Sequence, residues 1–390
     1  MKGRTRVNHP PDAAVPADNR PLVAPIYQSV KFAFDSLDEA LRFNRGEREG
    51  YFYTRRANPT TRQLEKLLAE LQGRDDCVAL GSGIASVSAC LLTQLRAGDH
   101  LLCFVETYGP SLHLIQGLLA RFGVTHTMLS IEDDAGTERA LAERPTKLVY
   151  FESPTNPITR IADIARITRA ARAHGALTVL DNTFAGFHNH GQYGIDLFLH
   201  SLTKYASGHG DVMGGAIIGR PELIRPIRRE SILLGMLLDP HAAFLVLRGM
   251  KTYYLRYEAQ AASAMRIAGF LEAHPAVERV HYPGLPGHPR HALAREQMHE
   301  FGSIVAFDLA GGPDAVQAFA DALEFFAITP SVGSVESLML PPQLLRGRGF
   351  SKEQVAISGV GEGTVRLSIG IEDTDDLIGD LDAALAQAGG

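Results

Sequence analysis

The feature that most constrains the fold is an alternation of short apolar runs with helix-like segments, extending from about residue 59 to residue 235. The apolar runs are residues 77–80, 100–105, 147–152, 176–181 and 196–201. Buried strands that alternate with helices form mostly parallel sheets with helices on both faces. We therefore predict an α/β domain. Such sheets bind ligands beyond the carboxyl ends of their strands, so the polar residues after each run are the first candidates for a site.

The two ends of the chain have other patterns. Residues 1–55 contain several prolines and little periodicity, which predicts an extended arm that another part of the protein must cover. The main domain is predicted at 56–245, and a long helical pattern at 248–274 leads from it into a smaller α+β domain at 246–390. The expected elements of that domain are a strand at 303–309, a helix at 315–326 and a strand at 364–371.

Charge and hydropathy exclude several classes of function. The chain has 38 Lys and Arg residues against 44 Asp and Glu residues, a net charge of −6, so no basic surface is expected to bind nucleic acid or anionic membranes. No apolar stretch approaches the roughly 20 residues of a membrane helix. The first twenty residues lack the apolar centre of a signal peptide. We expect a cytoplasmic protein.

The residue types that bind metals do not form a metal-binding pattern. The cysteines stand singly in apolar runs, which is typical of core residues in a reducing compartment: Cys77, Cys90 and Cys103. The histidines lack accompanying cysteines or matched carboxylates and fall in loop-like or exposed-helix contexts: His188, His190, His288, His291 and His299. We expect neither a disulfide framework nor a metal site.

The strongest chemical signal is a carboxylate and a lysine on one predicted rim. Asp181 ends the run 176–181, and Lys204 follows the next run, 23 positions later. A pyridoxal-phosphate site needs a lysine that forms a Schiff base and a carboxylate that keeps the ring nitrogen protonated. Asp181 and Lys204 fit these two roles. A lone lysine after a strand is more often a surface residue, so the prediction depends on its neighbours.

Hydroxyl groups and a glycine-rich turn near that rim could bind a phosphate group. Ser201 and Thr203 precede the lysine, and the Gly-Ser-Gly turn at 81–83 opens a helix-like segment. Free backbone N–H groups at a helix start bind phosphate oxygens. Most turns of this kind are only turns, and this one gains weight because it follows a strand at the same rim.

Three further residues each have a functional and a structural interpretation. Tyr108 could stack on the cofactor ring and move protons, or be an ordinary rim tyrosine. Asn156 could hydrogen-bond the phenolic oxygen of the ring, or belong to a simple turn. Arg366 lies inside an apolar strand-like run and needs a buried partner, either a substrate carboxylate or a structural salt bridge.

The order of motifs resembles the transsulfuration enzymes, which include cystathionine γ-synthase, cystathionine γ- and β-lyases, methionine γ-lyase and homoserine-ester sulfhydrylases. The likeness covers nearly the whole chain. The matching segments are APIYQS at 24–29, YTRRANPT at 53–60, ESPTNP at 152–157, DNTF at 181–184, HSLTKYASGHGD at 200–211, RGMKT at 248–252, YPGLPGHPRHALAREQM at 282–298, VESL at 335–338 and VRLSIGIED at 365–373.

The resemblance implies the fold of type I pyridoxal-phosphate enzymes, with a mostly parallel seven-stranded sheet and a smaller C-terminal α+β domain. It implies that Lys204 forms the Schiff base, Asp181 pairs with the ring nitrogen and Tyr108 stacks on the ring. The implied phosphate contacts are Gly83, the backbone of Ile84, Ser201 and Thr203. The implied substrate contacts are Arg366, Ser331, Asn156 and Tyr53.

The resemblance also implies self-association. Tyr53 and Arg55 would reach the cofactor phosphate of a neighbouring subunit, so each site would need two chains, and a homotetramer built from such dimers is expected. Three departures from the family pattern bear on the substrate. Residues 108–111 read YGPS, which is nearer the form found in bacterial cystathionine β-lyases. Pro330 replaces a frequent acidic residue, and His113 stands where cystathionine enzymes often carry arginine.

These residues predict a reaction class better than a single reaction. Our first expectation is a carbon–sulfur lyase that eliminates at the β- or γ-carbon of cystathionine or a related sulfur amino acid. The enzymatic alternative is γ-replacement on an acylated homoserine. A catalytically silent member, retained for binding, is a third possibility, but such a chain would be free to lose Lys204, Asp181, Tyr108 and Arg366, all of which are present.

Overall fold

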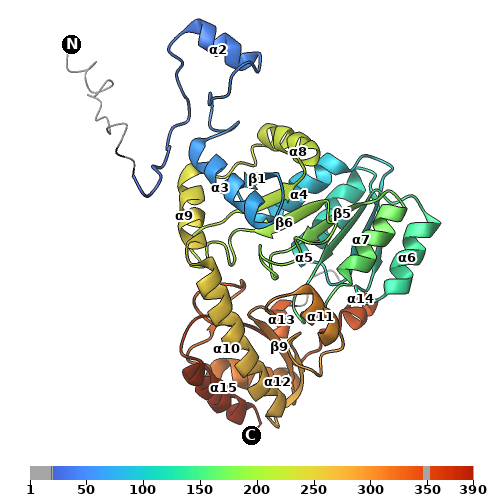
Figure 1. Ribbon diagram of the computed structural model, residues 1–390. Helices are drawn as coiled ribbons and strands as arrows, with labels where there is room; N and C mark the ends of the chain where they lie inside the picture. Colours follow the sequence, from blue (N-terminus) through green and yellow to red (C-terminus); the bar gives the residue numbers. More distant parts are fainter. Residues whose placement is uncertain (1–18, 20, 346–351, 390) are drawn as a thin grey trace.

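The computed structural model describes Asn19, residues 21–345 and residues 352–389, and it contains two sheets with helices packed against them (Figure 1). The larger sheet is mostly parallel and the smaller one lies in the C-terminal part. The α/β class predicted from the alternating pattern is therefore confirmed. Among the described residues, no helix is both long and apolar enough to span a membrane.

The larger sheet has seven strands in the order β1-β7-β6-β5-β4-β2-β3. Their bounds are β1 Asp76–Leu80, β2 His100–Phe104, β3 Thr125–Leu129, β4 Leu148–Glu152, β5 Leu177–Asp181, β6 Leu197–Ser201 and β7 Gly215–Gly219. All pairings are parallel except those of β7 with β1 and β6. Each of the five predicted apolar runs forms a strand.

Helices cover both faces of this sheet, as expected for parallel strands that are buried on both sides. One face carries α4 (Gly83–Gln94), α5 (Gly109–His113), the π-helical turn η1 (Leu114–Leu119) and α8 (Pro221–Leu234). The opposite face carries α3 (Pro59–Leu71), α6 (Asp134–Glu143), α7 (Ile164–Ala173) and α9 (Pro240–Met250).

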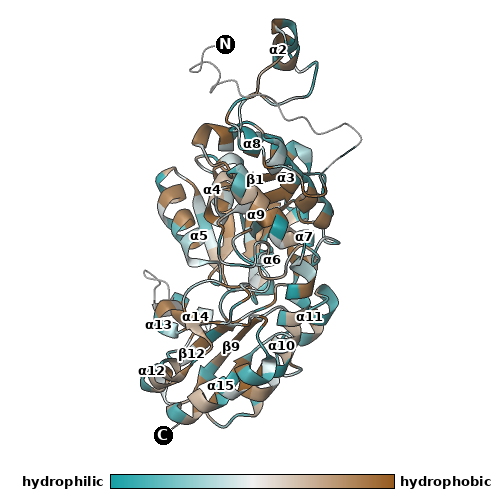
Figure 2. Cartoon of the chain, turned by 90° about the vertical axis from the view of Figure 1, so that its left-hand side faces the viewer, coloured by the Kyte–Doolittle hydropathy of each residue, from teal (hydrophilic) through white to brown (hydrophobic). Residues whose placement is uncertain are grey.

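The smaller sheet has five strands in the order β10-β11-β12-β9-β8. Their bounds are β8 Val277–His281, β9 Ile304–Leu309, β10 Ala327–Ile328, β11 Leu338–Leu340 and β12 Thr364–Ser368. Its apolar strands β9 and β12 pack against α10 (Tyr253–Ala273), α12 (Gly312–Ala322) and α15 (Thr374–Ala388) (Figure 2). Three short helices complete this part: α11 (His291–Gln297), α13 (Pro342–Leu345) and α14 (Lys352–Ser358).

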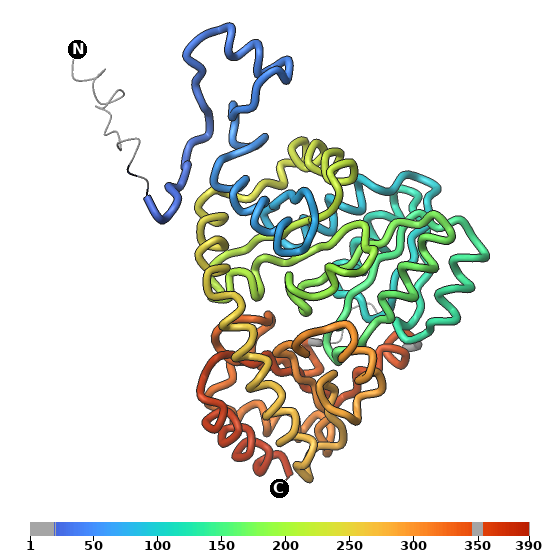
Figure 3. Tube along the Cα trace, in the orientation of Figure 1, coloured from blue at the N-terminus to red at the C-terminus, as the bar shows by residue number. Residues whose placement is uncertain are grey.

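Two expected helices differ from their patterns, one because it is divided and the other because it ends early. The pattern at 248–274 is divided between α9 and α10, with Lys251 and Thr252 between them. Figure 3 shows the two helices running from the larger sheet to the smaller one. The helix expected at 315–326 stops at Ala322, and the N–H groups of Glu324 and Phe325 donate instead to the carboxylate of Asp380.

The described part of the N-terminal arm stands away from the body of the molecule (Figure 1). It contains α2 (Leu37–Asn44), which has no buried residue, and a single β-bridge between Lys31 and Tyr53. Its aromatic rings contact mainly one another, as in the group Phe34, Phe43 and Phe52. The arm therefore has no core of its own in one chain.

Candidate active site

The carboxyl edge of the larger sheet gathers most of the residues predicted from the sequence. Asp181 is the last residue of β5 and Ser201 the last residue of β6. The hydroxyl of Thr183 joins these two strand ends, because it donates to Asp181 Oδ1 at 2.6 Å and accepts from the N–H of Ser201 at 2.9 Å. The parallel register of the sheet thus creates the predicted rim.

Asp181 lies in surroundings that keep a carboxylate both buried and hydrogen-bonded. Burial raises its pKa, while the hydroxyl and the backbone N–H of Thr183 lower it by donating to Oδ1 at 2.6 and 3.1 Å. Hydrogen bonds to the charged form favour ionisation. Asp181 could therefore pair with a protonated ring nitrogen, which would offset the remaining cost of burial.

Lys204 is directly linked to the residues proposed to bind substrate. Its Nζ donates to the Ser331 hydroxyl at 2.8 Å. Burial, with a smaller contribution from the charge of Arg366, lowers the pKa of Lys204 to about 8. Ser331 has a φ of 132°, a conformation that costs energy for a residue with a side chain and is typical of functional sites. A neutral amine is thus accessible near neutral pH.

Arg366 lies on β12 of the smaller sheet and points its guanidinium to the same site. It donates to Asn156 Oδ1 at 2.9 Å and to the Ser331 carbonyl at 2.8 Å, and its buried Nε has no hydrogen-bond partner among the described residues. Burial lowers its pKa to about 10. No carboxylate lies within ion-pair distance of Arg366 in the described part of the chain, so the geometry favours an external carboxylate over a structural salt bridge.

Tyr108 lies at the start of α5, and its backbone N–H donates to Glu152 Oε1 at 2.6 Å. Burial raises the pKa of its hydroxyl, and the charges of Glu152 and Asp181 raise it further, while Arg366 lowers it. The residue as a whole is still 46% exposed. A protonated, partly exposed phenol at this position could contact a planar ring or donate a proton.

The start of α4 has the features expected of a phosphate site. Ser82 caps the helix by accepting from the N–H of Ala85 at 3.1 Å, and the N–H groups of Gly83 and Ile84 precede the first intrahelical bonds. A Cβ on Gly83 would lie 2.9 Å from the side chain of Ser201, so only glycine permits this approach. Thr203 lies nearby in sequence and exchanges hydrogen bonds with Gly214.

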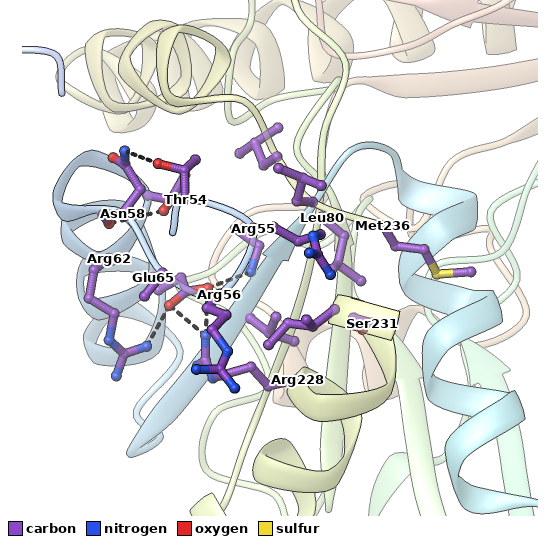
Figure 4. A pocket seen from close by; sticks show the side chains of 17 residues that line it. Thr54, Arg55, Arg56, Asn58, Arg62, Glu65, Leu80, Arg228, Ser231 and Met236 are labelled. Carbon is purple, nitrogen blue, oxygen red and sulfur yellow. Dashed lines mark hydrogen bonds and ion pairs between the residues drawn. The ribbon is translucent and has the colours of Figure 1, made fainter. Parts of the chain in front are cut away.

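Tyr53 and Arg55 are not brought to this edge within one chain. Both are exposed, and the Arg55 guanidinium lies 5.4 Å from the centre of the Tyr53 ring. Arg55 lines a different pocket, between α3 and α8, where Glu65 accepts from Arg228 at 2.9 Å (Figure 4). That pocket is lined by no lysine, and its carboxylate, Glu65, is already paired with Arg62 and Arg228, so we take the strand edge as the candidate site.

The cysteines and histidines lie elsewhere. All three cysteines are buried thiols, and burial raises the pKa of Cys90 and Cys103 to about 12. The His188 ring contacts Glu300 at 3.0 Å, and the buried His190 contacts Asn182 at 2.7 Å. No group of three or more potential metal ligands is found in the described ranges.

Comparison with known proteins identifies the family. Residues 10–386 match the family described as Cys/Met metabolism PLP-dependent enzymes. The chain belongs to this family. It is 39% identical to an L-methionine γ-lyase of Pseudomonas putida over 93% of this chain and 92% of that one. It is 37% identical to a chloroplastic cystathionine γ-synthase of Nicotiana tabacum, over 93% of this chain and 68% of the relative.

Solved structures of family members have the same fold. A cystathionine γ-synthase of Xanthomonas oryzae pv. oryzae, crystallised with cystathionine, superposes with a TM-score of 0.88 at 38% identity and covers 94% of this chain and 93% of that chain. A putative O-acetylhomoserine (thiol)-lyase of Campylobacter jejuni has a TM-score of 0.88 at 29% identity, covers 94% and 96% of the two chains, and carries pyridoxyl-lysine phosphate. The family assignment and the pyridoxal-phosphate dependence predicted from the sequence are confirmed.

The residues of this chain fit that cofactor. The unpaired Nε of Arg366, the close approach of Gly83 to Ser201 and the hydrogen-bonded carboxylate of Asp181 are features that bind a carboxylate, a phosphate and a protonated ring nitrogen, respectively. Lys204 would carry the cofactor covalently. When bound, pyridoxal phosphate supplies an electron sink for charge that develops on a substrate carbon.

Sequence reasoning missed two residues of the site, Thr183 and Glu152. Thr183 stands two positions after Asp181, a spacing at which an Asp side chain commonly accepts from the local backbone and hydroxyl groups. Glu152 was treated only as the end of an apolar run. Its position as the charged last residue of that run, on the strand next to β5, was the signal that could have identified it.

Proposed function

We propose that this protein is a carbon–sulfur lyase that eliminates at the β- or γ-carbon of cystathionine or a related sulfur amino acid. The observation that carries the proposal is the connected set of Lys204, Ser331, Arg366 and Asn156, joined by hydrogen bonds of 2.8 to 2.9 Å. It holds a base and a carboxylate receptor side by side. A substrate bound through its α-carboxylate would therefore present its α-carbon to Lys204.

The roles of the side chains follow from their surroundings. Arg366 binds and orients the α-carboxylate, with Asn156 beside it. Lys204 removes the α-proton, because its lowered pKa of about 8 makes the neutral amine available. Tyr108, whose pKa is raised chiefly by burial, keeps its proton near neutral pH and can deliver it to the departing sulfur. These assignments serve β- and γ-elimination alike.

The alternative is γ-replacement on an acylated homoserine. It is favoured by the similarity to cystathionine γ-synthases and to an O-acetylhomoserine (thiol)-lyase, whose identities of 29 to 38% overlap those of the methionine γ-lyases. The two reactions share proton removal from the α-carbon. They differ in whether a second nucleophile enters after the leaving group departs.

The distal part of the substrate site favours a small or weakly polar group. Pro330 directly precedes Ser331 and has neither a charge nor an N–H group to offer. His113, on the exposed side of α5, is a weaker partner for an anion than the arginine that cystathionine enzymes often carry. We propose that methionine-like substrates are accepted as well as cystathionine.

The active enzyme is proposed to be a dimer, or a homotetramer built from two such dimers, in the cytoplasm. Tyr53 and Arg55 would complete the phosphate site of a neighbouring subunit, because both are exposed and their arm has no core within its own chain. We also propose three functional parts: the arm at 1–55, the cofactor-binding domain at 56–245 and the C-terminal domain at 246–390.

One experiment separates the candidate reactions. The purified holoenzyme is supplied separately with cystathionine, methionine, cysteine and an acylated homoserine, with and without cysteine as a nucleophile. Elimination predicts ammonia and a keto acid from the sulfur amino acids alone, together with a thiol from methionine or cystathionine and hydrogen sulfide from cysteine. A new amino acid formed only from acylated homoserine and cysteine would contradict the lyase proposal and favour replacement.

A further inference from the structure

Three acidic residues lie at or just beyond the ends of three adjacent strands, at the carboxyl edge of the larger sheet. Glu106 comes two positions after β2, Glu152 ends β4 and Asp181 ends β5. The strand order places β4 between the other two, and Glu152 is paired in register with Asp181. Burial raises the pKa of Glu152 well above its usual value, and the charges of Asp181 and Glu106 raise it further. The middle carboxyl thus has an acidic neighbour on each side.

The outer two carboxylates each have strong donors. Glu106 Oε1 forms an ion pair of 2.5 Å with Arg160 Nη1, and its Oε2 accepts from the N–H of Ile131 at 3.0 Å. Asp181 accepts from the backbone and hydroxyl groups of Thr183. A protonated ring nitrogen would give Asp181 a cationic partner as well. Both outer carboxylates are therefore equipped to remain ionised.

Glu152 has much weaker compensation. Its side chain is buried, and it accepts one hydrogen bond, from the backbone N–H of Tyr108 to Oε1 at 2.6 Å. Among the residues described, no Lys, Arg or His nitrogen lies within 4.0 Å of its carboxylate. A buried carboxylate without a cation is costly, and two like charges so near each other cannot both persist in a low-dielectric site. The middle carboxyl is the one that should stay neutral.

The other groups around this carboxyl supply no positive charge. The hydroxyls of Thr107, Ser111 and Tyr150 are buried and have no hydrogen-bond partner in the described ranges. Tyr150 still lowers the pKa of Asp181, although its hydroxyl lies outside ordinary hydrogen-bond geometry. Cys90 lies beyond Tyr150, and burial raises the pKa of its thiol to about 12, so it is neutral. The two cations nearby act on other groups: Arg160 is paired with Glu106, and the charge of Arg366 lowers the pKa of Tyr108.

We propose that Glu152 is a positioning residue that holds the backbone of Tyr108 while keeping its own proton, so that the negative charge next to the cofactor ring is confined to Asp181. The proposal rests on the roles proposed above for Asp181 and Tyr108. Glutamine at position 152 has the same shape, keeps an acceptor for the Tyr108 N–H and carries no charge. Alanine keeps neither the acceptor nor the shape.

Infrared difference spectroscopy of the holoenzyme tests the protonation state directly. The wild-type spectrum minus that of Glu152→Gln at neutral pH should contain the C=O stretching band of a protonated carboxyl. The matched control, Glu106→Gln, should lack this band, because Glu106 is paired with Arg160. In the wild type alone, the band should disappear as the pH is raised. Absence of the band from the Glu152 difference spectrum would overturn the proposal.

Cofactor binding tests the positioning role. Losing the hydrogen bond to Tyr108 should cost about 1 to 1.5 kcal/mol, so Glu152→Ala should bind pyridoxal phosphate roughly tenfold more weakly than wild type. Glu152→Gln should restore most of this loss. Equal losses in the two variants would show that Glu152 acts through its charge and would contradict the proposal. Attachment of the cofactor at Lys204 is measured separately. A wrong role for Lys204 can therefore be distinguished from a wrong role for Glu152.

Discussion

The carboxyl edge and the N-terminal arm differ in how much of their surroundings one chain provides. At the edge, Lys204, Arg366 and Asp181 each bond to neighbours from another segment or turn of the same chain. In the arm, Tyr53 is 39% exposed and Arg55 contacts chiefly the Tyr53 ring. One chain thus brings together Lys204, Arg366 and Asp181, whereas it leaves Tyr53 and Arg55 away from them.

This difference has a physical cause. The edge residues sit at the ends of strands whose apolar side chains are almost wholly buried, so the sheet fixes their positions before any ligand binds. The arm has α2 without a buried residue, and ordering such a segment costs conformational entropy that its own contacts do not offset. A second copy of the chain can offset this cost by covering the arm. We therefore expect substitutions at the edge to cause large losses of activity within one chain, and substitutions in the arm to affect the site of a second chain.

The largest effect is expected from Lys204→Ala. Removal of the base should lower turnover by about three powers of ten or more, because general-base catalysis alone contributes 10²- to 10⁴-fold. Borohydride reduction of the wild-type holoenzyme should attach pyridoxyl phosphate to Lys204, as peptide mass mapping would show. Attachment at another lysine, or wild-type turnover in the variant, would contradict the assigned role.

Most of the edge could be predicted from the sequence, because polar residues that directly follow apolar runs identify strand ends. Lys204 and Asp181 were found in this way. β7 was missed, because its sequence, GAIIG, begins and ends with glycines. Those glycines are needed, since a Cβ on Gly215 would overlap the Ser82 carbonyl and one on Gly219 would lie 2.7 Å from the Asp196 carbonyl. Close packing here overrides strand propensity.

Other parts of the site depend on contacts between segments far apart in the sequence. Nothing local indicates that Arg366 donates to Asn156, 210 positions away, or that Ser331 adopts a φ of 132° to reach Lys204. Glu152 has a clear position at the end of its strand, but its environment follows from the strand order, which places it between Glu106 and Asp181. Sequence patterns thus predict which residues lie at strand ends better than they predict which of these residues contact one another.

The arm should give the next largest effect. Arg55→Ala should weaken pyridoxal-phosphate binding roughly ten- to a hundredfold, since charge-assisted hydrogen bonds contribute about 1.5 to 3 kcal/mol. Mixed dimers of Arg55→Ala and Lys204→Ala chains should regain activity at one site of two, because one site receives both intact residues. Arg56→Ala, which alters the adjacent exposed arginine, is the matched control and should bind pyridoxal phosphate as tightly as the wild type. Failure to recover activity despite verified subunit exchange would argue that Arg55 acts within its own chain.

A smaller effect concerns the pH dependence of cofactor capture. Only the neutral amine of Lys204 attacks the cofactor aldehyde, and its pKa is lowered to about 8. The capture rate of the apoprotein, followed by visible absorption, should rise as the pH increases toward about 8 and level off above it. Arg366→Gln should move the midpoint upward, because the charge of Arg366 lowers this pKa. Arg55→Ala should leave the midpoint unchanged. A shift in that variant would show that the arm also influences the pKa of Lys204, which would contradict the contrast drawn between the edge and the arm.

The smallest effect is expected at Pro330, which is exposed like the arm but directly precedes the edge residue Ser331. Without a dedicated partner for the distal ammonium of cystathionine, the wild type should prefer cystathionine over methionine by no more than about one or two powers of ten in kcat/KM. Pro330→Glu would add an exposed ion pair worth about 0 to 1 kcal/mol, so it should shift that ratio up to roughly fivefold toward cystathionine. Pro330→Gln controls for loss of the proline ring. An equal shift in both variants would assign the effect to the backbone, and strong wild-type selectivity for cystathionine would show that other residues recognise its distal group.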